Sequence, residues 1–434
     1  MKLKSIAVSI AVLLIAGCFA ACSDGTDKKN ESDESFSVSE SESIGKEDSY
    51  DSGSNDGENN DKENNDNENN DGENDVEQPV TPTIHRITAE TAGVKVLGER
   101  YLASENSLHL DWTCSGAEFV VDLKGTSILF NFTVSADCYF RVWVDGEVYL
   151  QSGSEYHTVT TGTGMLYVKG LTAGKHTIRI MKVTGYTLAR AELTGVTFAG
   201  SILADTDTSD KELYIEFIGD SITCGWGTIG EHKGAYTDQD GTLAYPYLLA
   251  EALDADYSMV GISGHKLVEH LIKKDADGNI DESMYLKTSH LKSPNASYDF
   301  ARQADIVVIN IGTNDVSYSV GAEKFEDYYY TLLQTVREKN GDDCKILCLY
   351  NAMNYTYESS ILSACERVGG EANGVTVFKL DRAANNAHPN IAEHAAYAAE
   401  LKNVILNLPA PIAPTITVIP EGDGDLDGID FSID

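Results

Sequence analysis

The sequence predicts an α/β protein with two folded domains, an all-β domain followed by a parallel-sheet domain. Three observations support this. Residues 84–202 contain short alternating apolar segments separated by turn residues, with no helical period. From residue 212 to residue 408, strand patterns alternate with helical patterns, which is typical of a parallel sheet covered on both faces. A chain of 434 residues is long enough to bury two such cores.

Residues 1–22 have the composition of an export signal. Lys2 and Lys4 precede an apolar run from Ile6 to Ile15, which is too short to span a bilayer permanently. The string IAGC, ending at Cys18, resembles a bacterial lipobox and implies a lipid-modified cysteine; AAC, ending at Cys22, is a second candidate. The alternative is a plain secretory signal with two incidental cysteines. We expect an exported protein held at a bacterial cell surface by a lipid anchor in the membrane.

Two further segments are expected to be disordered. Residues 23–83 consist almost entirely of Asp, Glu, Asn, Ser and Gly, so they cannot bury enough apolar surface to fold. An acidic tether is the interpretation we favour over a site for a cationic partner. The net charge of -37 argues against nucleic acid as a partner. The tail, 409–434, imitates a calcium loop from Asp423 to Asp434, but no helix follows, and we expect an acidic disordered terminus.

Six cysteines lie beyond the signal: Cys114, Cys138, Cys224, Cys344, Cys348 and Cys365. They form no CxxC pair and no histidine joins them at metal-ligand spacing, so we expect no metal and no cofactor. Cys114 and Cys138 are a possible disulfide after export, whereas Cys224, Cys344 and Cys348 lie in apolar segments typical of buried thiols.

The first domain, residues 84–202, is predicted to be a β-sandwich. Trp112, Tyr139 and Trp143 are either a sugar-binding platform or part of the core, and aromatic residues on sandwich strands more often belong to the core. Residues 203–211 are polar and are predicted to link the domains. The clearest strands are Glu118–Leu123, Ser127–Val134, Tyr139–Val144, Leu166–Val168, His176–Val183 and Ala191–Phe198.

The second domain, residues 212–408, is predicted to alternate strands and helices with right-handed crossovers. Functional side chains of such sheets lie on loops at the carboxyl ends of the strands. After the strand that begins at Leu213, we expect strands at Tyr257–Ile262, Ile306–Ile311, Lys345–Tyr350 and Val375–Leu380, and helices at Ala244–Leu253, Lys324–Lys339, Ser359–Val368 and Ile391–Leu406.

Four strings follow these strands in order: GDSITCGWG from Gly219, SGHKL from Ser263, NIGTNDVS from Asn310 and HPN from His388. In this order they resemble the SGNH (GDSL-type) hydrolase superfamily. With the β-rich segment ahead, the chain is similar to carbohydrate esterase family two, which removes acetyl groups from plant polysaccharides. The resemblance covers roughly residues 101–408. It implies a jelly-roll domain followed by a flavodoxin-like three-layer SGNH domain.

Ser221 and His388 are the predicted catalytic pair. A serine hydroxyl is a poor nucleophile, so it needs a base within hydrogen-bond reach. His388 lies between the last strand and the last helix, on the same rim as Ser221, and would take the hydroxyl proton and return it to the leaving sugar.

The resemblance also implies an oxyanion hole. Its donors would be the backbone N–H groups of Ser221 and Gly264 and the side-chain amide of Asn314. Asp315 is expected to cap its own turn without taking part in the chemistry.

One position departs from the superfamily pattern, because Asn385 stands where an aspartate usually lies three residues before the catalytic histidine. Loss of the orienting carboxylate costs about 10⁴ in turnover in a serine triad. Three possibilities stay open: a Ser–His dyad oriented by a backbone carbonyl, which we favour, the oxygen of Asn385, or Asp381.

The predicted function is a metal-independent serine esterase that acts on acetylated polysaccharide or oligosaccharide. Trp226 is the first candidate for an aromatic wall against a sugar ring, with domain packing as the alternative, and Tyr236, Tyr318 and His265 are weaker candidates. Two other functions remain: a carbohydrate-binding surface lipoprotein with a vestigial hydrolase domain, and a lipase or thioesterase of the same superfamily.

Overall fold

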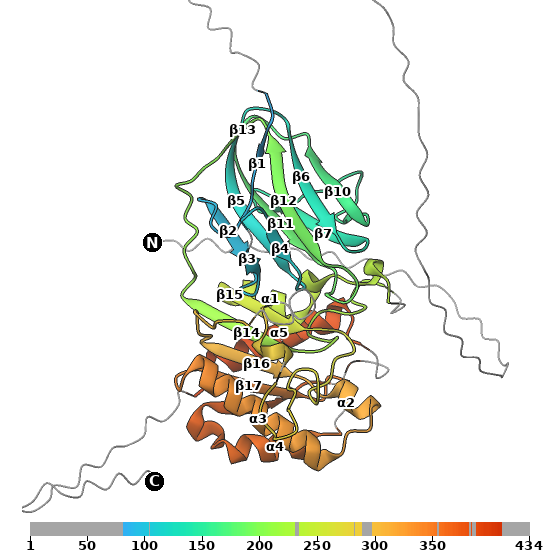
Figure 1. The fold of residues 1–434 in the computed structure, drawn as a ribbon, viewed down its shortest axis with the longest axis vertical. Coiled ribbons are helices and arrows are strands. Elements are labelled where there is room, and N and C mark those ends of the chain that lie inside the picture. The colour runs from blue at the N-terminus through green and yellow to red at the C-terminus, as the bar shows by residue number, and fades with distance from the viewer. Residues whose placement is uncertain are drawn as a thin grey trace, which may run out of the picture. The chain divides into compact units, whose positions relative to one another are not determined.

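The computed structural model describes residues 81–103, 105–230, 234–281, 283–288, 297–353, 356–381, 383 and 388–409. They belong to one compact unit of the chain (Figure 1). The predictions for Cys18, Cys22, Asn385, the acidic tail and nearly all of the acidic tether lie outside these residues. Among the helices of the described ranges, none has the length and apolar character that a membrane span requires.

The first domain is a sandwich of two antiparallel sheets, which confirms the predicted all-β architecture. The first sheet has the order β10 (Gly162–Lys169), β6 (Ser127–Val134), β12 (Ala191–Phe198), β4 (Leu108–Leu110), β3 (Leu102–Ala103), with β1 (Thr83–His85) paired to β12. The second has the order β13 (Gly200–Ile202), β5 (Ser115–Leu123), β11 (Gly174–Lys182), β7 (Cys138–Val144), β8 (Glu147–Val148), with β2 (Val94–Leu97) paired to β5 and β9 (His157–Val159) paired to β7.

The sandwich core is aromatic, and the two cysteines considered for a disulfide do not share it. Phe132 and Phe140 pack between the sheets with ring centroids 4.3 Å apart, and Cys138 lies in this core. Cys114 belongs instead to the apolar cluster that joins the two domains. Both thiols are free and buried, so the possible Cys114–Cys138 disulfide is wrong.

The second domain is a three-layer α/β domain around one parallel sheet, as predicted (Figure 1). The sheet order, 2-1-3-4-5 in chain order, is that of the flavodoxin-like fold. The strands, in spatial order, are β15 (Ala255–Gly261), β14 (Leu213–Gly219), β16 (Ile306–Asn310), β17 (Lys345–Tyr350) and β18 (Val375–Lys379).

Helices cover both faces of this sheet. Helices α1 (Tyr245–Leu253) and α5 (Ile391–Leu406) share one apolar cluster with residues of β14 and β16, and residues of the first domain join it. Helices α3 (Ala322–Asn340) and α4 (Glu358–Arg367) pack against the opposite face in a second cluster. In the described part of the chain, five short helical elements lie in the loops: the 3-10 helices η1 (Tyr236–Asp238), η2 (Gly241–Leu243), η3 (Met284–Leu286) and η4 (Gly370–Asn373), and helix α2 (Thr313–Ser317).

A buried ion pair connects the domains. Arg100, from the first domain, donates to the carboxylate of Glu216 on β14 at 2.6 Å, and both side chains are about 1% exposed. Its guanidinium also donates to the backbone carbonyl of Tyr285 at 2.5 Å and lies 4.2 Å from the ring centroid of Tyr298. The charge of Arg100 is therefore compensated inside the protein, which a buried cation requires.

The aromatic residues considered as a sugar platform on the sandwich form no such platform. Trp112 is only 3% exposed and donates from Nε1 to the carbonyl of Thr288 in the other domain at 2.7 Å. Tyr139 and Trp143 are half-buried against the apolar cluster between the domains. These three residues therefore serve packing.

Candidate active site

The loops that follow four of the five parallel strands carry the predicted site residues. Ser221 follows β14, Gly264 follows β15, Asn314 follows β16, and His388 lies between β18 and α5. Because the strands are parallel, all four positions lie at the same edge of the sheet.

Ser221 and His388 are in direct contact. The Nε2 atom of His388 lies 2.7 Å from the Oγ atom of Ser221, although the two residues are 167 positions apart. A tight turn presents the serine: the N–H of Trp226 donates to the carbonyl of Ser221 at 2.9 Å. Gly219 is required at the strand end, because a Cβ there would lie 2.6 Å from the carbonyl oxygen of Asn310. The local geometry is therefore that of a nucleophile with its base.

A second histidine, His394, lies near His388 but differs from it in environment. His394 lies in the first turn of α5 and is fully buried, and its pKa is lowered to about 3 by desolvation and by the nearby His388. Its Nδ1 accepts the backbone N–H of Tyr245 at 3.2 Å, which anchors α5 to α1. At neutral pH His394 therefore stays uncharged and does not compete for the proton of Ser221.

The group that orients His388 stays a prediction. Asn385 lies outside the described residues. Asp381 is exposed, and its backbone carbonyl accepts the hydroxyl of Tyr397 at 2.6 Å. The dyad, the oxygen of Asn385 and the carboxylate of Asp381 therefore all remain open.

The predicted oxyanion donors lie on neighbouring loops. Gly264 is exposed with φ of +82°, and no heavy atom lies within 4 Å of the position that a Cβ would take. Within the described part of the chain, the backbone N–H groups of Ser221 and Gly264 have no hydrogen-bond acceptor. The amide of Asn314 donates to the carbonyl of His265 at 2.8 Å, which fixes its orientation and leaves its second N–H available.

Asp315 forms hydrogen bonds to a different loop from the one we expected. Its carboxylate is fully buried and accepts the backbone N–H groups of Leu267 at 2.8 Å and Val268 at 3.1 Å. Desolvation raises the pKa of this carboxyl group, and the two N–H donors oppose that shift. Asp315 therefore ties α2 to the loop that carries Gly264 instead of capping its own turn.

Asp220, directly before the nucleophile, is also buried. Its Oδ1 accepts the N–H of Ile222 at 3.1 Å. Desolvation raises the pKa of its carboxyl group to about 7, with a smaller contribution in the same direction from the charge of Asp315. The buried carboxylate of Asp220 therefore stabilises the turn on which Ser221 lies.

The aromatic candidates differ in how open they are. Trp226 is half-buried, and its ring packs against Gly234, where a Cβ would lie 3.2 Å away. The ring of Tyr236 meets the edge of Tyr139 from the first domain, with centroids 5.1 Å apart. Tyr318 is 65% exposed, beside Lys266. The role of Trp226 as a sugar wall stays a prediction, and Tyr318 is the most open ring of the three.

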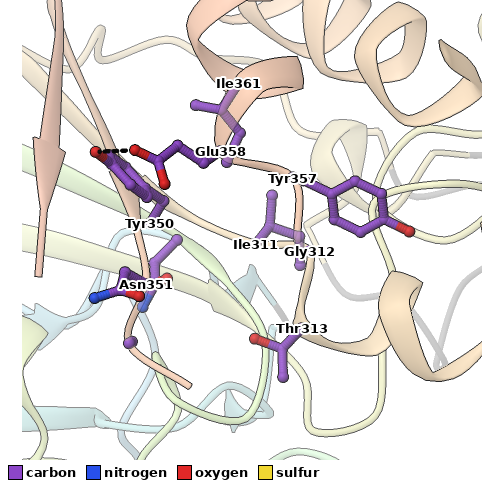
Figure 2. A pocket seen from close by; sticks show the side chains of 10 residues that line it. Ile311, Gly312, Thr313, Tyr350, Asn351, Tyr357, Glu358 and Ile361 are labelled. Atoms are coloured by element: carbon purple, nitrogen blue, oxygen red, sulfur yellow. Dashed lines mark hydrogen bonds between the residues drawn. The ribbon is translucent and has the colours of Figure 1, made fainter. Parts of the chain in front are cut away.

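A pocket that the sequence did not indicate lies beside this rim. Its hollow measures about 310 Å³ including the space open to solvent, and it adjoins Thr313, the residue before Asn314. Figure 2 shows the hydrogen bond at 3.1 Å between Tyr350 and Glu358 on one of its walls. The lining residues are Asn310, Ile311, Gly312, Thr313, Tyr350, Asn351, Ala352, Tyr357, Glu358 and Ile361.

The described residues also contain one acidic group with metal-ligand spacing, formed by Glu99, Asp210 and Asp256. Arg302 lies 2.8 Å from Glu99 and 2.7 Å from Asp256, and Lys95 lies 2.9 Å from the other oxygen of Asp256. The cations already compensate these carboxylates, so the group is an ion-pair network at the amino ends of the strands, away from Ser221.

Comparison with protein families gives two matches. Residues 217–428 match the GDSL-like Lipase/Acylhydrolase family, and residues 102–205 match the carbohydrate esterase 2 N-terminal domain. Cellulase/esterase CelE of Acetivibrio thermocellus is 28% identical over 341 residues, which is 72% of this chain and 40% of that protein. An acetylxylan esterase / glucomannan deacetylase of Cellvibrio japonicus is 32% identical over 164 residues, 35% of this chain and 42% of that protein. The chain thus spans less than half the length of these two relatives.

Solved structures agree with the family matches. A family two carbohydrate esterase from Clostridium thermocellum, in complex with cellohexaose, is 27% identical with a TM-score of 0.62, covering 73% of this chain and 98% of that one. An acetyl xylan esterase from Butyrivibrio proteoclasticus has the same fold, with a TM-score of 0.62 at 19% identity, over 75% of this chain and 98% of that one. The chain therefore carries a GDSL-like (SGNH-type) lipase/acylhydrolase domain, preceded by the N-terminal domain of carbohydrate esterase family two.

Proposed function

We propose that this protein is a serine esterase that removes O-acetyl groups from plant cell-wall polysaccharides such as xylan or glucomannan, or from their oligosaccharides. The contact of 2.7 Å between Ser221 Oγ and His388 Nε2 carries the proposal, because it supplies the activated nucleophile that ester cleavage needs. The relatives named as acetylxylan esterases support the substrate class.

The reaction proceeds in two steps. His388 takes the proton of Ser221 while Oγ attacks the acetyl carbonyl, and the developing oxyanion accepts hydrogen bonds from the backbone N–H groups of Ser221 and Gly264 and the amide of Asn314. Collapse of this intermediate expels the sugar oxygen, which receives the proton from His388, and leaves an acetyl ester on Ser221. Water, deprotonated by His388, then attacks that ester and releases acetate.

The exported, lipid-anchored location is part of the proposal and rests on residues 1–22. Replacing Cys18 with Ser should abolish incorporation of a labelled fatty acid when the full chain is expressed in a bacterium. If the label persists and is lost on replacing Cys22, the second lipobox is the one used. A label that survives both substitutions would exclude the anchor.

Replacement of Ser221 by Ala tests the esterase. We expect acetate release from acetylated xylan and from an aryl acetate to fall by about 10⁴-fold or more. Ser209→Ala, in the exposed segment between the domains, is the control and should keep wild-type rates. Undiminished acetate release by the Ser221→Ala protein would refute the nucleophile.

The same experiment separates the alternatives. A serine-directed phosphonate probe should label wild-type protein at Ser221. A chain that binds acetylated glycans but takes up no label would be a carbohydrate-binding protein with a vestigial site. Faster cleavage of long-chain esters than of acetates would indicate a lipase or thioesterase.

A further inference from the structure

A cation and an exposed aromatic ring lie next to the predicted oxyanion hole. The Nζ atom of Lys266 lies 4.8 Å from the ring centroid of Tyr318, and 65% of the surface of Tyr318 is exposed. Lys266 is two residues from Gly264, on the loop that follows β15. An exposed aromatic ring has an apolar face and a polar edge, which suits it to stack against a sugar.

Two hydrogen bonds place this pair at the site. Tyr318 is four residues from Asn314 and its N–H donates to the carbonyl of Asn314 at 3.0 Å, so the two residues lie on the same side of α2. The amide of Asn314 in turn donates to the carbonyl of His265, the residue before Lys266. The pair therefore borders the position where the ester carbonyl would lie.

Lys266 forms no close ion pair within the described part of the chain, and Asp315 and Glu269 act on its charge only at longer range. No carboxylate there lies within ion-pair distance of its Nζ atom, although the protein has a net charge of -37. Lys324, a nearby surface lysine, shows the contrast, because it pairs with Glu269 at 3.4 Å. Lys266 has the geometry of a cation that is available to an anionic group on a ligand.

We infer that Lys266 and Tyr318 form a subsite for a sugar unit that bears a carboxylate, located next to the acetylated unit. This inference rests on the proposed function and narrows it to acidic glycans that carry uronic acid groups. Tyr318 stacks against the sugar ring, and the ammonium group of Lys266 pairs with the carboxylate. Because Tyr318 is exposed and Lys266 is only half-buried, the gain is modest and falls as salt screens it.

The test compares two forms of one substrate. Acetate release is measured at low ionic strength from two acetylated xylans of equal chain length. One carries uronic acid side groups and the other is neutral. We expect wild-type kcat/KM to be about threefold to fivefold higher on the acidic form. Lys266→Met should reduce this ratio to about one, Lys266→Arg should keep most of it, and raising the salt concentration should shrink it in the wild type.

Lys169→Met is the matched control. Lys169 lies over the exposed ring of Tyr167 at the same distance, 4.8 Å, but on strand β10 of the first domain. Its substitution should leave the ratio at the wild-type value. Tyr318→Ala should raise KM for both polymers, because stacking does not depend on the carboxylate.

Either of two results would overturn the inference: a wild-type ratio of one, or a preference for acidic xylan that survives Lys266→Met. Failure of the proposed function is distinguishable, because in that case no acetate is released from either polymer or from an aryl acetate. A folded Lys266→Arg protein that keeps the ratio excludes general loss of structure as the cause.

Discussion

Two buried carboxylates, Asp220 and Asp315, support the site without touching substrate. Both lie behind the rim, and both accept backbone N–H groups of loops that carry predicted catalytic atoms. Their value for the reaction is positional, because a donor that is misplaced by even a small distance loses much of its effect on the transition state.

Asp315→Asn should lower kcat by about 10-fold to 100-fold with little change in KM. The amide offers one acceptor where the carboxylate offers two, so the loop with Leu267 and Val268 shifts and Gly264 moves with it. Steady-state kinetics with an aryl acetate, and the affinity for a boronic acid that mimics the tetrahedral intermediate, measure the effect.

Asp305→Asn is the control for that substitution. Asp305 accepts the backbone N–H of Tyr214 at 2.8 Å, but at the amino end of the sheet. Its replacement should leave kcat unchanged. Equal losses in the two variants, or a rise in KM alone for Asp315→Asn, would contradict a role in positioning the oxyanion donors.

Asp220 should make stability depend on pH. Its pKa of about 7 in the folded protein lies above its ordinary value of 3.8, so its contribution is fully present below pH 3.8 and is lost as pH rises through 7. Wild-type protein should therefore lose more free energy of unfolding between pH 5 and pH 8 than Asp220→Asn, by a few kcal/mol at most. Urea unfolding at the two pH values measures the difference. Parallel losses in both proteins would show that Asp220 is ionised throughout.

At the scale of elements, the first domain braces the loop that follows the nucleophile. Arg141 on β7 donates to Asp240 at 3.1 Å and to Thr242 at 2.7 Å, and the N–H of Gly241 donates to the carbonyl of Val183 at 3.0 Å. These contacts hold η2 and the turn before it, next in sequence to η1, which begins at Tyr236. The sandwich is thus a structural part of the site's surroundings.

Arg141→Met should loosen this segment selectively. Removing the guanidinium leaves the carboxylate of Asp240 buried with one charge partner fewer, which typically costs about 3–5 kcal/mol. We expect faster hydrogen exchange in residues 234–243 than in α3, together with a higher KM for polymeric substrate. Uniformly faster exchange across both domains would indicate global destabilisation instead.

The regular elements of the fold could be predicted from the sequence because their patterns are local. The strands Ser127–Val134 and Lys345–Tyr350 and the helix Ile391–Leu406 have the predicted bounds. Helix α2 was missed, since five residues that begin in a glycine-containing motif have no helical period to read. The paired edge strands of two to four residues were missed for the same reason.

The site was predictable only in part. The contact of Ser221 with His388 follows from parallel strand ends meeting at one edge. The two bonds of Asp315 do not, because its partners lie 48 and 47 positions away and no pattern marks them. Likewise, nothing in the sequence shows that Lys266 lies over Tyr318.

At the scale of the whole molecule, Arg100 and Glu216 couple the stability of the domains. Arg100→Leu should cost about 3–5 kcal/mol in the free energy of unfolding, because it leaves the Glu216 carboxylate buried without its partner. The double variant Arg100→Leu, Glu216→Leu should recover part of that loss. Urea unfolding with a double-mutant cycle measures the coupling. If the double variant were less stable by the sum of the single losses, the pair would not be coupled.

The position of Arg100 also limits how this protein can be recombined with others. A chimera joined within residues 203–211 would take the guanidinium of Arg100 from one parent. It would take the groups that accept its hydrogen bonds, Glu216 and Tyr285, from the other parent. If the sandwich from the other parent has no arginine at this position, the Glu216 carboxylate remains buried in the sheet without a counter-charge. Exchange of the two domains between relatives should therefore succeed only when both parents have this arginine and this glutamate.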